Sequence, residues 1–168
     1  ELRLVPTGTL LKIVDLDLAA WRTNFKANLD AVFLSTKKVL PWMHEAKKGS
    51  IVNIASVVGL KGVAYMSAYG AAKAGLINFT RAAAIEAAPH VRVNCIIPGA
   101  VMTPATQRAI PGEELMEATA KTIPLQRIAQ PIELAKPIAF LLSSDASFIT
   151  GASLVVDGGK TADLNAGN

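Results

Sequence analysis

Apolar residues recur along this chain with two different periods. In three long segments they return every three to four residues, which is typical of amphipathic helices. The predicted helices cover Asp17 to about Glu45, about Ser67 to about Ala88, and Pro131 to about Ser144. Asp17 is a suitable N-cap for the first helix, which we expect to be kinked, and Pro89 stops the second.

Three shorter segments are continuously apolar. They predict buried strands at 51–55, 91–97 and 152–156. Because strands and helices alternate, residues 1–168 are predicted to form one α/β domain, with a parallel sheet covered by helices. Residues 100–130 interrupt the alternation with several prolines and a weak helical pattern near Glu113 to Lys121. We expect this long excursion to act as a substrate loop or lid.

Composition narrows the class of protein further. Hydrophobic residues make up 51% of the chain and aromatic residues only 5%, which suits an aliphatic α/β core. The net charge of +4 comes from scattered residues, and neither a basic stripe nor an aromatic platform points to nucleic acid. No apolar run reaches the roughly 18 residues that a membrane span requires. We therefore expect no nucleic-acid or membrane partner.

The cysteine and the histidines show no reactive context. Cys95 is the only cysteine, which excludes an internal disulfide and fits a reducing, cytoplasmic location. It lies in an apolar strand pattern, so an inert buried thiol is expected. His44 and His90 fall at a charged helix end and in a turn, without the spacing of metal ligands. We therefore expect no metal site.

The candidate chemistry lies between the first predicted strand and the second predicted helix. Ser56 follows the strand directly, at the carboxyl end where ligands bind in open α/β sheets. Tyr69 and Lys73 are four residues apart on a helix and therefore share one face. A nearby ammonium favours the phenolate form of tyrosine, which would let Tyr69 exchange a proton nearer neutral pH.

Two later segments strengthen this pattern. Asn94 to Thr103 ends a strand with Pro98-Gly99, and Gly151 to Gly159 contains the last strand followed by Asp-Gly-Gly. With Asn28 placed upstream, the whole set, in this order and spacing, resembles the short-chain dehydrogenase/reductase family. The resemblance covers essentially residues 1 to 159 and implies a Rossmann-like, doubly wound parallel sheet, of which this chain is the carboxyl-terminal part.

The resemblance implies a role for each residue of a catalytic set. Tyr69 would be the general acid in carbonyl reduction and the base in alcohol oxidation. Lys73 would lower the pKa of Tyr69 and hold the nicotinamide ribose hydroxyls. Ser56 would donate a hydrogen bond to the substrate oxygen. Asn28 would use its backbone carbonyl to hold a water molecule that connects the lysine to solvent.

The resemblance also implies cofactor and substrate contacts. Pro98 and Gly99 would form a turn against the nicotinamide, and Val101 and Thr103 would contact its carboxamide. In addition to Ser56, we expect Tyr65 and Met102 to contact the substrate. Further candidates for the substrate pocket are Gly59, Val63, Met66 and parts of 105–125.

The glycine-rich phosphate loop of the family has no match in this sequence. Gly59 to Gly62 follows the first strand with the wrong spacing, and Thr7-Gly8-Thr9 follows no predicted strand. The resemblance therefore places the phosphate loop, and the residue that selects NAD or NADP, in a segment that would precede Glu1. The preference between NAD and NADP cannot be read from this sequence.

The sequence thus predicts an NAD(P)-dependent oxidoreductase that interconverts a carbonyl and a secondary alcohol. Its partner would be a small carbonyl or alcohol substrate, and the resemblance implies a homo-oligomer, tetramer or dimer. Two alternatives remain open at this point. The chain could be a non-catalytic fragment or scaffold subunit, or it could use Tyr69 for dehydration or epimerisation.

Overall fold

Three parallel strands form the sheet of this protein, whose structure, a computed structural model, describes residues 10–163. The strands are β1 (Gly49–Ile54), β2 (Val91–Pro98) and β3 (Ser153–Val156), in the order β1-β2-β3. The register pairs Asn53 with Cys95, and Cys95 with Ser153. Since β2 lies in the middle and is buried on both faces, its sequence is apolar almost throughout.

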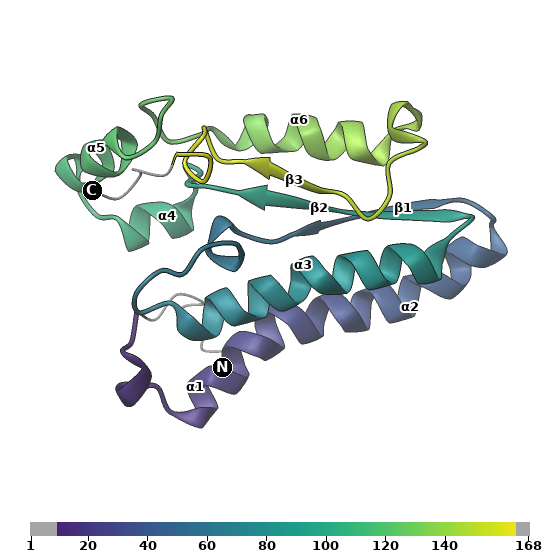
Figure 1. The fold of residues 1–168 in the computed structure, drawn as a ribbon, viewed down its shortest axis with the longest axis horizontal. Coiled ribbons are helices and arrows are strands. Elements are labelled where there is room, and N and C mark those ends of the chain that lie inside the picture. The colour runs from purple at the N-terminus through teal and green to yellow at the C-terminus, as the bar shows by residue number, and fades with distance from the viewer. Residues whose placement is uncertain (1–9, 164–168) are drawn as a thin grey trace.

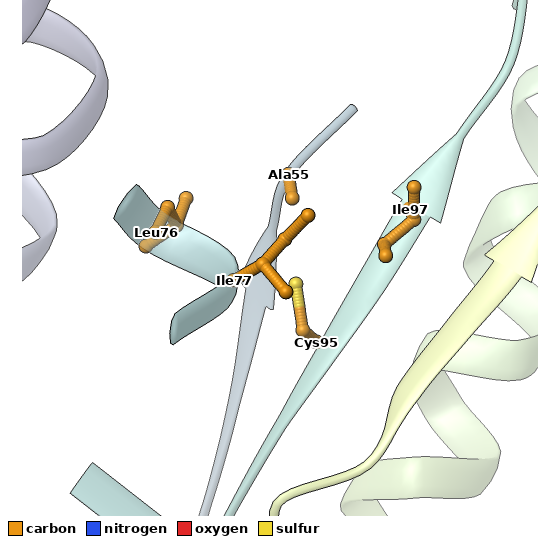
Figure 2. Packing of buried hydrophobic residues seen from close by; sticks show 5 residues of the cluster. All are labelled: Ala55, Leu76, Ile77, Cys95 and Ile97. Carbon is orange, nitrogen blue, oxygen red and sulfur yellow. The ribbon is translucent and has the colours of Figure 1, made fainter. Parts of the chain in front are cut away.

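Helices cover both faces of the sheet, as predicted (Figure 1). The helices α2 (Ala31–Glu45) and α3 (Ser67–Ala87) lie on one face, and α6 (Pro131–Leu142) lies on the other. Successive residues of β2 point to opposite faces, so Cys95 packs toward α3 whereas Ile96 packs against α6. Figure 2 shows Ile77 of α3 pointing toward Cys95 and Ala55 in the first of these clusters.

The predicted kink in the first helix is a change of helix type. The segment consists of α1 (Leu18–Phe25), a π-helical turn η2 (Lys26–Asp30), and α2. Asp17 is the N-cap, as expected, and its Oδ1 accepts a hydrogen bond from Ala20 N at 2.7 Å. Single π-helical turns within α-helices occur frequently at functional sites. Asn28 lies within this π-helical turn.

Residues 100–130 hold two short helices. The helix α5 (Glu113–Lys121) matches the weak pattern in the sequence, whereas α4 (Pro104–Ala109) was not predicted. Thr103 caps α4, and Pro104 stands at its first position, where proline is tolerated. The chain after β3 is bonded to the segment that follows α5. There, Leu125 N donates to Gly158 O, and Lys160 Nζ donates to Thr122 Oγ1.

Most predicted boundaries agree with the structure within one or two residues. The last helix ends at Leu142 because Ser143 starts a new turn, η4 (Ser144–Ala146), by accepting from Asp145 N. Two other short turns, η1 (Ile13–Asp15) and η3 (Val57–Gly59), were not predicted. Thr7-Gly8-Thr9 lies outside the described residues. In residues 10–163 no helix is both long and apolar enough to cross a lipid bilayer.

Hydrogen bonds from Arg92 of β2 join the end of α6 to the sheet. Its Nη1 donates to Leu141 O at 2.8 Å and to Ile149 O at 3.4 Å. Its Nη2 donates to Ser143 O at 2.9 Å and to Leu142 O at 3.5 Å. The last carbonyls of a helix have no intrahelical partner, so the guanidinium satisfies them and joins α6 to the central strand.

Candidate active site

Ser56 lies just beyond the carboxyl end of β1, as the sequence predicted. It is half-buried, and its Oγ accepts a hydrogen bond from Val58 N at 3.3 Å, which caps the turn η3. Because this bond uses an oxygen lone pair, the Ser56 hydroxyl hydrogen stays available to donate to another group. Ser56 can therefore donate to an oxygen atom that lies near the end of β1.

Tyr69 and Lys73 stand in the first two turns of α3, beside Ser56. Lys73 Nζ donates to Ile54 O at 2.9 Å, so α3 is bonded to the carboxyl end of β1. The same ammonium lies 5.7 Å from the centroid of the Tyr69 ring. The Tyr69 hydroxyl interacts with the Ser56 side chain. The structure therefore brings together the three residues that the sequence singled out most strongly.

Burial controls the protonation of both helical residues. It raises the pKa of Tyr69 above the ordinary value of 10.0, and the interaction with Ser56 lowers it only in part. Burial also lowers the pKa of Lys73 below its ordinary value of 10.5. The net shift of the Tyr69 pKa is therefore upward, and the role of Lys73 in lowering it stays a prediction. The ammonium is bonded to Ile54 O and lies over the ring, and desolvation of the phenol is the larger effect.

Two glycines allow the loop after β1 to touch the backbone of α3. A Cβ on Gly59 would lie 2.8 Å from the carbonyl carbon of Lys73, and a Cβ on Gly70 would lie 3.0 Å from Val58 O. Both distances are shorter than ordinary contacts. Gly59 lies against the helix that carries Tyr69, and its expected contact with substrate stays a prediction. The small size of Gly59 brings Ser56 within reach of Tyr69.

Asn28 is buried in the π-helical turn η2, which packs against α3. Its Nδ2 donates to Asn24 O at 3.0 Å, so the side chain is satisfied within its own helix. Leu29 of the same turn lies 3.1 Å from the position of a Cβ on Gly75. The role expected for the Asn28 carbonyl stays a prediction.

The segment that comes after β2 in the chain lies beside the end of β3 in space. Pro98 is the last residue of β2, and Gly99 N donates to Val156 O at 3.0 Å. A Cβ on Gly99 would lie 2.9 Å from the Cα of Asp157, so a glycine is needed here for packing alone. Val101 forms a parallel bridge with Ala129.

Val101, Met102 and Thr103, which were predicted to contact ligands, also make contacts within the fold. Val101 packs against the cluster around Ile96. Met102 N donates to Ala129 O at 2.8 Å. The Oγ1 of Thr103 accepts from Thr106 N at 3.2 Å and caps α4. All three are half-buried. The nicotinamide contacts of Val101 and Thr103 and the substrate contact of Met102 remain predictions.

Tyr65 lies at the start of α3 in a left-handed conformation, with φ of 67°. The residue is 51% exposed, and its carbonyl oxygen accepts a hydrogen bond from Leu11 N at 3.1 Å. Such a conformation is uncommon for a large side chain and marks a position fixed by its surroundings. Tyr65 and Met66 line a small cavity together with Tyr69, whereas Val63 is exposed. The assignment of these residues to a substrate pocket remains a prediction.

A larger cavity, of about 90 Å³, lies away from Tyr69, at the ends of β2 and β3. Its walls include Ala100, Ile123 and Val156. Cys95 is fully buried, and burial raises the pKa of its thiol, as expected for an unreactive cysteine. Within residues 10–163 no cluster of three or more His, Cys, Asp or Glu side chains could hold a metal ion.

Sequence reasoning missed Asn24. This side chain is only 8% exposed and stands one helical turn before Asn28, and it borders the cavity beside Tyr69. Two asparagines four residues apart in one helix share a face, and this repeat could have pointed to Asn24. The family resemblance assigns a role to Asn28 and none to Asn24.

Known proteins resemble this chain over nearly its whole length. A family model described as enoyl-(acyl carrier protein) reductase matches residues 6–161. The cyclopentanol dehydrogenase of Comamonas sp. (strain NCIMB 9872) is 40% identical over 156 residues, which are 92% of this chain and 62% of that protein. The cis-4-hydroxycyclohexanecarboxylate dehydrogenase of Sinomonas cyclohexanicum is 45% identical over 149 residues, which are 88% and 59% of the two chains. The chain thus spans about three fifths of the length of these curated relatives.

A solved structure described as a short chain dehydrogenase/reductase family protein has the same fold. It superposes with a TM-score of 0.83 at 36% identity, and the match covers 91% of this chain and 63% of that one. The parallel sheet with helices on both faces is therefore the Rossmann-like sheet that the sequence predicted. With Ser56, Tyr69 and Lys73 gathered at the end of β1, these matches show that the chain belongs to the short-chain dehydrogenase/reductase family.

Proposed function

We propose that the protein is a nicotinamide-dependent oxidoreductase that interconverts a secondary alcohol and a ketone at Ser56, Tyr69 and Lys73. The observation that carries this proposal is the convergence of these three side chains at the carboxyl edge of the sheet. The matched relatives include dehydrogenases of cyclopentanol and of cis-4-hydroxycyclohexanecarboxylate. These names support an alicyclic secondary alcohol as the substrate class.

The residues at the site fit a nicotinamide cofactor. An ammonium has three donors, and Lys73 gives one of them to Ile54 O, so two remain for hydroxyl oxygens such as those of a ribose. Lys73 is only half-buried, which leaves these donors accessible. Pro98, Gly99, Val101 and Thr103 would border the ring, and Tyr69 and Lys73 would face the ribose. When bound, the cofactor accepts or supplies the hydride.

The protein residues then handle the proton and the charge on the substrate oxygen. In alcohol oxidation, Tyr69 Oη accepts the hydroxyl proton of the substrate, and in ketone reduction it returns this proton. Ser56 Oγ–H donates to the same substrate oxygen and stabilises the negative charge that develops there. Lys73 stabilises the phenolate of Tyr69 once it forms. Asn28 would connect Lys73 to solvent through a water molecule held by its backbone carbonyl.

The test compares turnover of the purified native protein with that of two tyrosine variants. Cycloalkanols are supplied with oxidised NAD or NADP and cycloalkanones with the reduced cofactors, and the formation or loss of the reduced cofactor is followed by absorbance. We expect Tyr69→Phe to lower kcat by at least about a hundredfold, the range for loss of a general acid or base. Tyr65→Phe removes the other tyrosine hydroxyl, and we expect it to change KM more than kcat. Equal activity of Tyr69→Phe and the native protein would refute the proposal.

The alternatives give different results in the same assay. Turnover of a substrate without net change in cofactor absorbance would indicate a dehydratase or epimerase. Failure of the native protein to bind either cofactor would favour a scaffold subunit. The expected homo-oligomer is supported by large apolar side chains that lie exposed on α2 and α3, which are Phe33, Leu34, Trp42 and Ile85. Light scattering of the native protein would measure its oligomeric state.

A further inference from the structure

A small cavity lies where α1 meets the start of α3, next to the proposed catalytic tyrosine. Its volume is about 10 Å³, which is room for about one water molecule. Its walls come from Leu11, Leu16, Asn24 and the segment from Tyr65 to Tyr69. Two polar atoms of this wall, Asn24 Oδ1 and Ser67 Oγ, are buried and have no hydrogen-bond partner within the described part of the chain.

Buried polar atoms without a partner are rare because each costs about 1 to 3 kcal/mol. The orientation of the Asn24 amide is fixed by its other atom, since Nδ2 donates to Ala20 O at 3.2 Å. The reverse orientation would set the Asn24 carbonyl oxygen against that of Ala20. Asn24 therefore presents an acceptor to the cavity, and this acceptor needs a donor.

The start of α3 supplies groups of the opposite kind. Met66, the N-cap, makes no side-chain cap, and the first intrahelical bond runs from Gly70 N to Met66 O. The amides of Ser67, Ala68 and Tyr69 precede that bond, and all three residues line the cavity. Their N–H groups need an acceptor.

One molecule satisfies both sides only if it both donates and accepts. An anion would be repelled by Asn24 Oδ1, and a cation would be repelled by the positive end of the α3 dipole. A water molecule can accept from an amide of the first turn and donate to Asn24 Oδ1 and Ser67 Oγ. We propose that Asn24, Ser67 and the first turn of α3 bind one buried water molecule, which caps α3 and positions Tyr69.

Through Asn24, the proposed water molecule is linked to Asn28 and the π-helical turn. Asn24 O accepts from Asn28 Nδ2, while the Asn24 side chain faces the first turn of α3. Asn24 thus links the π-helical turn with the helix that carries Tyr69. It acts as a positioning residue, and its effect on turnover rests on the proposed function, whereas the water site itself does not.

The first test is a crystal structure of the native protein at a resolution that shows ordered water. We expect density for one water molecule within hydrogen-bond distance of Asn24 Oδ1 and Ser67 Oγ. In Asn24→Leu, which has a similar volume and no acceptor, this density should be lost. A native structure in which the two atoms bond to other protein groups, or face no density, would overturn the proposal.

The second test is amide hydrogen exchange at Ala68 and Tyr69 in the same proteins. Without the water we expect exchange about five- to tenfold faster, the factor for one net hydrogen bond. Asn24→Asp keeps an acceptor toward the water but sets its second oxygen against Ala20 O, so we expect it to restore slow exchange only in part. Thr23→Ala is the matched control, because it removes the bond from Thr23 Oγ1 to Ala19 O in the same helix without touching the cavity.

A further variant guards against misfolding of Asn24→Leu. Alanine favours helix more than serine does, so Ser67→Ala should stabilise α3 if helix propensity alone decides. Faster exchange at Ala68 in Ser67→Ala would support the water site, and slower exchange would contradict it. If Tyr69→Phe kept full turnover, the proposed function would fail, while density and exchange would still decide the water site.

Discussion

Replacing Gly59 with alanine tests whether the contact between η3 and α3 sets the geometry of the active site. The added methyl group would lie 2.8 Å from the carbonyl carbon of Lys73, 2.9 Å from Ala74 N and 3.1 Å from Lys73 O. All three are backbone atoms inside a long helix, so they cannot rotate away. Gly59 does not have a positive φ, so alanine is tolerated by its backbone conformation. The effect is therefore purely steric.

The size of the displacement follows from these distances. Ordinary contact begins near 3.4 Å, so η3 must move away from α3 by roughly 0.6 Å. Ser56 begins this turn and moves with it, while Tyr69 and Lys73 stay with α3. A misplacement of about 1 Å can cost about a hundredfold in rate, so we expect a loss of about tenfold in kcat. Overpacking should also lower the free energy of unfolding by about 1 to 3 kcal/mol.

The assay measures kcat and the denaturant midpoint for Gly59→Ala and for Gly62→Ala. Gly62 stands three residues later, and a Cβ there meets nothing within 4 Å. Because alanine restricts the unfolded chain, Gly62→Ala should keep kcat and stabilise the protein by about 0.4 to 1 kcal/mol. If Gly59→Ala keeps the native kcat, or if both variants lose it equally, the contact does not set the geometry of the site.

Two further predictions concern protonation and stability. Because burial raises the pKa of Tyr69 above 10.0 in the ligand-free protein, a spectrophotometric titration without cofactor should show no tyrosine phenolate near neutral pH, and phenolate absorbance there would contradict this. The contribution of Tyr69 to stability is fully present below pH 10 and is lost as pH rises through the raised pKa, so the unfolding midpoint of the ligand-free protein should fall where the phenolate appears. Arg92→Met removes four bonds, three to carbonyls at the end of α6 and one to Ile149 O, and we expect it to cost about 3 kcal/mol in denaturant unfolding. A loss below about 1 kcal/mol would show that solvent replaces the guanidinium at these carbonyls.

Local patterns predicted the regular elements well because these patterns reflect burial. The strand at 91–97 was found from its apolar run, and the structure shows it buried on both faces of the sheet. Ser56, Tyr69 and Lys73 were found from spacing, since a strand end and one helical face are both defined by positions in sequence. Those inferences needed no knowledge of distant contacts.

What the sequence could not predict depends on contacts between distant segments. The contact of Gly59 with α3 was not predicted, because nothing near Gly59 in sequence indicates that a helix backbone lies against it. A kink in the first helix was expected, but its type and its position at Lys26–Asp30 depend on how η2 packs against α3. The helix α4 was not predicted, because a six-residue helix carries too little periodicity to be detected.

The shifts in the pKa of Tyr69 and of Lys73 indicate that proton transfer at this site depends on a ligand bound at Lys73. Burial disfavours the charged form of each group, so it raises the pKa of Tyr69 and lowers that of Lys73. Proton exchange at Tyr69 requires the phenolate, and stabilisation of the phenolate requires the ammonium. A ligand whose oxygens accept from the free donors of Lys73 would favour the charged lysine and, through it, the phenolate. By linkage, the same coupling would make that ligand bind more tightly to the charged pair. The fold thus supplies the geometry of proton transfer, and a ligand at Lys73 would supply the electrostatic balance that burial alone opposes.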